Sequence, residues 1–244
     1  MEFEELVKFR RSSRWMFSKK PIPDSELKKI LEAARFAPTP HNSQPFEIIV
    51  VKDEEVKRQL SEVGFRLGKK EVDEHFYWVR YTIEELETRK DGVYVDVLPK
   101  FVMDLQTNPK LVEDDGFWRK SMHLYSALIQ NSQVLLFILY NQERPGVGSL
   151  KHLWGIMSIG GVMQNIWLAA NNLGISAQLV SGQLMNIESV RKIRKILHIP
   201  EKGYRLLLIF RLGYERKFGK CGTKYRRELS DFVHLDQFSN NTFF

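Results

Sequence analysis

Seven consecutive apolar residues, VLLFILY at 134–140, stand in the middle of this chain. The run is far shorter than the roughly 18 apolar residues expected of a membrane helix. Its leucine, isoleucine, valine and aromatic content is instead typical of a strand buried inside a protein core. No longer apolar run stands elsewhere in the sequence, so we expect a soluble protein organised around such strands.

Patterns of apolar spacing predict the remaining elements. Strands are expected over 46–51, 134–140, 175–180 and 204–212, and helices over 2–9, 25–36, 54–62, 117–131, 159–173 and 187–199. Asp24 is the expected N-cap of the second helix, and Ala37–Pro40 ends it because proline removes a backbone donor. This alternation predicts α/β or α+β packing in a single domain, residues 1–244.

A variable insertion is expected around residues 54–156, because much of 54–116 is charged, aromatic and aperiodic. Within it, a strand or a loop is expected near Tyr94–Val97.

The bulk composition narrows the class of protein. A net charge of +7 fits an anionic ligand, and equally nucleic acid or a membrane surface. Cys221 is the only cysteine, so no intramolecular disulfide can form, which suits a reducing compartment. The N-terminus lacks the apolar core of a signal peptide, and we expect a cytoplasmic protein. The six histidines fit no metal-ligand spacing, and no metal is predicted.

Three arginines and two serines form the cluster FRRSSRW near the N-terminus. Arg10, Arg11 and Ser12 offer the forked cations and the short donor that a phosphate monoester requires. A solvated basic turn is the competing interpretation. The tail group Lys224-x-Arg226-Arg227 could supply a second phosphate contact, and a nucleic-acid surface competes with that interpretation.

Two further segments could bind a ligand through polar side chains or backbone groups. The loop PTPHNSQPF at 38–46 is held by three prolines, and Asn42 and Gln44 could read the edge of a heterocycle that bears C=O and N–H groups. An ordinary helix-ending loop is the alternative. Gly160 and Gly161 stand at an expected helix start, where either anion binding or close helix packing is possible.

Taken in order, these segments resemble the FMN-dependent nitroreductase family. The resemblance rests on RRSSRWMF at 10–17, APTPHNSQPFEIIVV at 37–51, GGVMQNIWLAANNLGISAQLVSG at 160–182 and IPEKGYRLLLIFRLGYE at 199–215, and on the basic KYRRELSDFVH at 224–234. These blocks cover about half of the chain, at both ends.

The resemblance implies an α+β, nitroreductase-like fold, with a central, mostly antiparallel sheet flanked by helices in an intertwined homodimer. It also implies FMN sites at the interface. Arg10, Ser12, Lys224 and Arg226, with Arg11 close by, match the family's phosphate-binding positions. Arg14 matches its cation at the flavin N1–C2=O edge. The loop residues Pro38, Thr39, Pro40, Asn42 and Gln44 match the segment that the other subunit lays against the flavin, and Ser181 and Gly182 match the turn near flavin N5.

The implied activity is transfer of a hydride from NAD(P)H, through flavin N5, to an electron-poor acceptor such as a nitroaromatic or quinone. Arg14 would act electrostatically, by stabilising charge at the flavin N1–C2=O edge. The alternatives are a specialised flavoenzyme of the same superfamily (a dehalogenase, an azoline oxidase or a flavin-cleaving enzyme) and a basic nucleic-acid-binding protein. The chain departs from the family at Thr39-Pro40, because proline removes a backbone donor.

Overall fold

The computed structural model describes residues 1–14, 16–76, 81–88, 100–148, 150–216, 226 and 228–238. The chain divides into two compact units. The first holds residues 1–66 and 119–219, and the second holds 67–118 and 220–244. The prediction of one domain with a variable insertion around 54–156 stays a prediction, although residues 54–66 and 119–156 of that range belong to the first unit.

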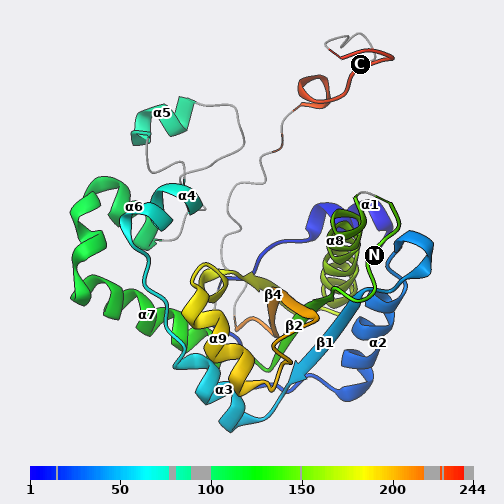
Figure 1. The fold of residues 1–244 in the computed structure, drawn as a ribbon, viewed down its shortest axis with the longest axis horizontal. Helices are drawn as coiled ribbons and strands as arrows, with labels where there is room; N and C mark the ends of the chain where they lie inside the picture. Colours follow the sequence, from blue (N-terminus) through cyan, green and yellow to red (C-terminus); the bar gives the residue numbers. More distant parts are fainter. Residues whose placement is uncertain are drawn as a thin grey trace. The chain divides into compact units, whose positions relative to one another are not determined.

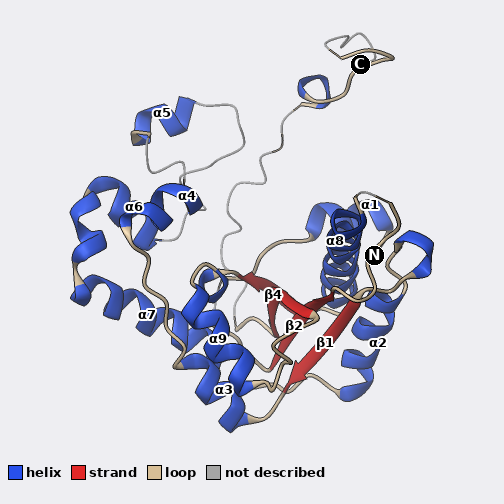
Figure 2. Cartoon of the chain, in the orientation of Figure 1, coloured by secondary structure: helices blue, strands red, loops and turns tan. Residues whose placement is uncertain are grey.

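A four-stranded antiparallel sheet forms the centre of the first unit (Figure 2). Its strands are β1 (Phe46–Val51), β2 (Val134–Asn141), β3 (Ser176–Val180) and β4 (Tyr204–Gly213), in the order β1-β2-β4-β3. The α+β class and the antiparallel sheet expected from the sequence are confirmed.

β2 is buried along its whole length, as its apolar sequence predicts. Because side chains alternate across a strand, Val134, Leu136 and Ile138 enter one hydrophobic core, whereas Leu135 and Phe137 enter another on the opposite face. The strand therefore joins two cores, and each core needs its own layer of helices.

Helices α2 (Asp24–Arg35) and α8 (Lys151–Asn172) cover one face of the sheet, and α3 (Glu54–Ser61) and α9 (Ile187–Ile196) cover the other (Figure 1). The short α1 (Phe3–Phe9) lies against α8. Length and composition alone would also allow α8 to cross a membrane, with a mean hydropathy of 1.2. The core that α8 shares with α2 and the sheet accounts for part of this apolar composition, since 39% of the apolar window is buried.

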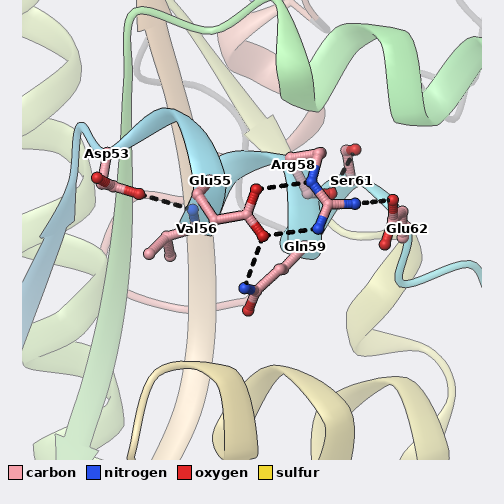
Figure 3. Close-up of polar contacts among 7 residues, drawn as sticks. All are labelled: Asp53, Glu55, Val56, Arg58, Gln59, Ser61 and Glu62. Atoms are coloured by element: carbon pink, nitrogen blue, oxygen red, sulfur yellow. Dashed lines mark hydrogen bonds and ion pairs between the residues drawn. The ribbon is translucent and has the colours of Figure 1, made fainter.

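Helix α3 follows β1 and begins at a side-chain cap. The Asp53 carboxylate accepts a hydrogen bond from the Val56 backbone N–H at 2.8 Å (Figure 3). On the exposed side of the helix, Arg58 donates to Glu55 at 2.6 and 2.7 Å and also pairs with Glu62. The hydrogen bond from Arg58 lowers the pKa of Glu55 to about 2. These contacts define where α3 begins and leave its apolar side for the core.

The second unit has a small core of its own. The unit includes α4 (Lys69–His75), α5 (Ile83–Thr88), α6 (Lys100–Thr107) and the start of α7 (Asp115–Gln130). The Phe101 ring meets Phe76 edge-on, with 5.8 Å between ring centroids, and Trp118 donates to the Val112 carbonyl at 2.9 Å. The possible strand at Tyr94–Val97 lies outside the described residues.

Three expectations about helix ends are wrong. Pro23 takes the N-cap position of α2, and Asp24 is already helical, with its carboxylate paired to Lys52. α8 begins at Lys151, eight residues before the expected start at 159, so Gly160 and Gly161 lie in its interior. α9 ends at Ile196 rather than 199, because Leu197 is its C-cap and His198 adopts a left-handed φ of 51°.

We predict opposite effects for two glycine-to-alanine changes in α8. A Cβ at Gly155 would lie 2.5 Å from the buried Tyr140 ring, whereas a Cβ at Gly160 would meet nothing within 4 Å. Gly160→Ala should therefore stabilise the protein by about 0.5–1 kcal/mol, through the higher helix propensity of alanine. Gly155→Ala should destabilise it by about 1–3 kcal/mol, because the core is overpacked. Urea denaturation at equal protein concentration measures both, and a Gly155→Ala variant as stable as Gly160→Ala would contradict the predicted close approach.

Candidate functional site

The segment from Arg10 to Phe17 is fastened to three different elements of the first unit. The Ser13 N–H donates to the Ala177 carbonyl on β3 at 2.9 Å, and the Trp167 indole on α8 donates to the Arg11 carbonyl at 3.0 Å. Phe17 forms a β-bridge with Glu215, just after β4. The backbone of the cluster seen in the sequence is therefore held at three places.

The cations of this segment lie in different surroundings. The Arg10 guanidinium stacks over the Trp167 ring, 4.5 Å from its centroid. Arg11 pairs with Glu215 at 2.5 Å, and the Glu215 side chain is only 1% exposed. Arg14 is exposed and Ser12 partly buried. Arg11 thus contributes an ion pair with a buried carboxylate, whereas Arg14 presents its charge to solvent.

A buried arginine lies directly behind Phe17. Arg211 is fully buried on β4, and its guanidinium lies 4.0 Å from the centroid of the Phe17 ring. It donates to Ser132 Oγ at 3.2 Å and to Gln178 Oε1 at 2.9 Å. Burial lowers the pKa of Arg211 to about 10, although the charges of Tyr125 and Glu215 oppose the shift, so the group remains protonated at neutral pH.

Arg211 was not among the residues expected at the site. Its signal in the sequence was a cation inside the apolar run YRLLLIFRLG, where burial requires polar partners. That signal indicates a buried network but does not identify its members, because Ser132 and Gln178 lie far from Arg211 in the sequence.

The loop that follows α2 is strained and polar. His41, Asn42 and Gln44 have φ values of 52°, 54° and 45°, in the left-handed region that non-glycine residues rarely adopt. The Gln44 N–H donates to Thr39 Oγ1 at 3.2 Å, and the Gln44 amide donates to Asn42 Oδ1 at 3.1 Å. Such strain persists where the surroundings hold the chain in place, which makes this loop a pre-organised polar surface.

Glycines allow this loop to lie close to α8. A Cβ at Gly161 would lie 3.4 Å from Pro38, and a Cβ at Gly146 would lie 3.1 Å from Pro40. Asn165, one turn beyond Gly161, donates to the Ala33 carbonyl of α2 at 2.9 Å. Of the two roles considered for Gly160 and Gly161, anion binding at a helix N-terminus is wrong, because both are interior to α8. Close packing is observed at Gly161.

The Ser181–Gly182 turn directly follows β3. Ser181 is exposed and Gly182 is buried. A Cβ at Gly182 would lie 2.3 Å from the Phe65 ring and 3.1 Å from Tyr125, so only glycine fits here. Burial raises the pKa of Tyr125, an effect opposed by the nearby backbone of Gln183 and the charge of Arg211. One side of the turn therefore rests on aromatic rings, while Ser181 faces solvent.

The structure does not relate the basic tail to the Arg10–Phe17 segment. Lys224 lies outside the described residues, and Arg226 belongs to the second unit. Their meeting with Arg10 and Ser12 therefore stays a prediction. Within the described ranges no group of three histidine, cysteine, aspartate or glutamate side chains could hold a metal ion.

The structure thus brings together two of the predicted segments. Arg10–Arg14 runs beside β3, and β3 leads directly into Ser181–Gly182. From Ala177 to Ser181, four residues at about 3.3 Å each span about 13 Å, so this hydrogen bond and the turn lie near opposite ends of β3. The loop at 38–44 lies against α8, and no described contact links it to Arg10–Arg14.

Comparisons with known proteins agree with this architecture. The FMN-dependent nitroreductase NfnB of Mycobacterium smegmatis, solved with NADPH, has a TM-score of 0.61 at 20% identity, over 96% of this chain and 97% of that one. The likeness shows that the two chains share a fold.

Curated relatives match shorter stretches. The NADH dehydrogenase of Thermus thermophilus is 46% identical over 65 residues, which are 27% of this chain and 30% of that protein. Iodotyrosine deiodinase 1 of Rattus norvegicus is 29% identical over 111 residues, 42% of this chain and 36% of that protein. The chain thus matches about a third of the length of these relatives.

The model of the nitroreductase family matches residues 7–214, which include the Arg10–Phe17 segment, the loop at 38–44 and the turn at 181–182. This match confirms the family expected from the sequence, and the chain belongs to the nitroreductase family.

Proposed function

We propose that this protein is an FMN-dependent oxidoreductase. FMN, when bound, would supply the redox chemistry, by taking a hydride from NAD(P)H and passing electrons to an electron-poor acceptor such as a nitroaromatic or a quinone. The observation that carries the proposal is the hydrogen bond from Ser13 to Ala177, because it ties a basic segment to β3, the strand that leads into Ser181–Gly182. Family membership and the FMN-dependent structural neighbour support it.

The residues of the Arg10–Phe17 segment divide by role. Arg10 and Ser12 bind the FMN phosphate, together with Lys224 and Arg226 of the tail. Arg11 lies near the phosphate and, through Glu215, holds the segment that carries the other two. Arg14 offers an exposed cation that stabilises negative charge at the flavin N1–C2=O edge, and this is its electrostatic part in catalysis.

The remaining contacts come from backbone and loop. The peptide groups of Ser181 and Gly182 approach flavin N5. Pro38, Thr39, Pro40, Asn42 and Gln44 form the surface that one subunit offers to the flavin of the other. The left-handed backbone of this loop fits such a role, because it fixes the amides of Asn42 and Gln44 before any ligand arrives.

An exposed apolar stripe supports a homodimer. Leu150, Leu153, Trp154 and Met157 recur at the spacing of one helical face at the start of α8, and each is at least 42% exposed. A Cβ at Gly146 would touch both Trp154 and Pro40, so the stripe adjoins the loop at 38–44. A second copy that covers the stripe would bring that loop to its neighbour's flavin.

A reductive dehalogenase is the second candidate. Iodotyrosine deiodinases of rat, mouse and zebrafish match about two fifths of this chain at 27–29% identity. The acceptor would then be a halogenated phenol in place of a nitroaromatic or a quinone. An azoline oxidase and a flavin-cleaving enzyme remain further alternatives, and the cytoplasmic location remains a prediction.

Anaerobic reduction of the FMN-loaded protein tests the proposal. The purified protein should bind FMN with a visible flavin spectrum, which NADH or NADPH should bleach and an acceptor should restore. Reoxidation by nitroaromatics and quinones favours the first candidate, and selective reoxidation by iodinated phenols with release of iodide favours the second. A protein that takes up no FMN and binds nucleic acid instead would refute both.

Arg10→Ala should weaken FMN binding by about ten- to a hundredfold, because a charge-assisted hydrogen bond contributes roughly 1.5–3 kcal/mol. Titration followed by flavin fluorescence measures the dissociation constant. Ser13→Ala is the matched control, because Ser13 Oγ is buried without a hydrogen-bond partner in the described structure. Equal affinity of the two variants would remove Arg10 from the phosphate site.

Arg14→Ala should make the flavin midpoint potential more negative, since the reduced flavin loses a nearby cation. The potential is measured by equilibration with a reference dye, and flavin reduction by NADH should slow in parallel. Arg191→Ala is the control, because it removes an exposed arginine on α9 that pairs with Glu188. A potential that is the same in wild type and Arg14→Ala would contradict the electrostatic role.

A further inference from the structure

Gln183, the residue after the Ser181–Gly182 turn, is fully buried although its side chain is polar. Its amide Nε2 donates to the Leu60 carbonyl at 2.8 Å and to the Val63 carbonyl at 2.7 Å. Leu60 lies in the last turn of α3 and Val63 just beyond its C-cap, and the Leu60 carbonyl also accepts from the Val63 N–H at 3.2 Å. The side chain therefore satisfies the end of one helix and fastens a distant turn to it.

Two further side chains, at the start of α9, donate hydrogen bonds to the segment that follows α3. Ser189 Oγ on α9 donates to the Gly64 carbonyl at 2.8 Å. Asn186 caps α9 through its Oδ1, and its Nδ2 donates to the Arg66 carbonyl at 3.2 Å. Three side chains of residues 183–189 thus donate to four carbonyls of residues 60–66, and Figure 1 shows α3 and α9 side by side.

Aromatic packing against Gly182 adds to these hydrogen bonds. The Phe65 ring lies against Gly182, and it meets the Tyr125 ring edge-on, with 5.3 Å between centroids. Ser181 and Gly182 use their carbonyls inside the turn, where these accept from Leu184 N and Met185 N at 2.9 and 3.2 Å. Gly182 has no side chain with which to anchor itself, so its peptide groups take their position from Phe65 and from the residue that follows.

We propose that Gln183 is a positioning residue, which holds the peptide groups of Ser181 and Gly182 for the flavin by fastening them to the end of α3. The inference rests on the proposed function, because it concerns the turn assigned to flavin N5. A backbone donor cannot adjust by side-chain rotation, so a shift of the turn changes its hydrogen bond to the flavin directly. The buried amide prevents that shift.

The variant Gln183→Met tests the role, since methionine has a similar length and cannot donate. FMN affinity of the full-length protein is measured by fluorescence titration, the midpoint potential by dye equilibration, and the melting temperature without FMN. We expect FMN binding about tenfold weaker, because two hydrogen bonds are lost, together with a changed potential. Asn171→Leu is the control, because the amide of buried Asn171 also donates to a backbone carbonyl, that of Ile175 before β3, and makes no described contact with the turn. It should lower the melting temperature and leave affinity and potential unchanged.

Ser189→Ala keeps the test decisive where Gln183→Met does not fold. It removes the hydrogen bonds of Ser189 Oγ to the Gly64 carbonyl at 2.8 Å and to Asn186 Oδ1 at 3.4 Å, and a several-fold loss of FMN affinity is expected, in the same direction. If Gln183→Met folds and keeps the FMN affinity and midpoint potential of the wild type, the positioning role is overturned and the proposed function stands. If Gln183→Met does not fold, the same result in Ser189→Ala overturns the role. A wild-type protein that binds no FMN would refute the proposed function itself and the positioning role with it.

Discussion

The guanidinium of Arg211 is a fully buried positive charge, and distant parts of the first unit meet around it to supply its polar and aromatic partners. A buried cation is tolerated only with hydrogen-bond acceptors or aromatic faces around it. Ser132 after α7, Gln178 on β3 and the ring of Phe17 provide them. These three residues come from distant parts of the chain, so one charge fixes how an N-terminal segment, a helix end and two strands meet.

This arrangement has a direct consequence for the candidate site. Phe17 can approach Arg211 because Gly213 leaves room, since a Cβ there would lie 2.3 Å from the ring. The chain between Phe17 and α1 is tied to β3 by the hydrogen bond from Ser13 to Ala177, and Arg10, Ser12 and Arg14 lie on that stretch. Glu215, which forms the β-bridge with Phe17, also holds this stretch through the ion pair of its buried carboxylate with Arg11. The contacts of Phe17 and Glu215 thereby help to place Arg10 and Arg14, which take no part in those contacts.

Local patterns predicted the regular elements well, and contacts between distant residues explain the errors. Strand β1 has the predicted bounds because prolines and a polar loop delimit its apolar run. The expected helix at 159–173 began too late because it was recognised from the stripe that α8 buries, whereas the apolar face of its first turns, with Leu153 and Trp154, is exposed. Asp24 stands one residue inside α2, where a carboxylate also suits the positive end of the helix dipole.

The candidate site shows the same division. The segments at 10–14, 38–44 and 181–182 could be recognised from their residues, because each concentrates donors, prolines or glycine in a short stretch. The residues that support them could not be recognised, because Gln183, Ser189 and Arg211 acquire their roles only when strands and helices meet. A buried glutamine in an ordinary turn has no distinctive sequence pattern, although its amide satisfies two carbonyls over a hundred residues away.

The ties behind the turn at 181–189 use neutral amides and hydroxyls that donate to backbone carbonyls. Such bonds carry no net charge, so they do not compete electrostatically for an anionic ligand and do not change with pH near neutrality. The charges of the first unit are arranged differently: Arg211 and Glu215 are withdrawn into the interior, and Arg14 remains exposed. A frame held by neutral bonds with cations at its surface is the arrangement that a phosphate-bearing, redox-active ligand requires, because the frame keeps its shape while the charge of the ligand changes.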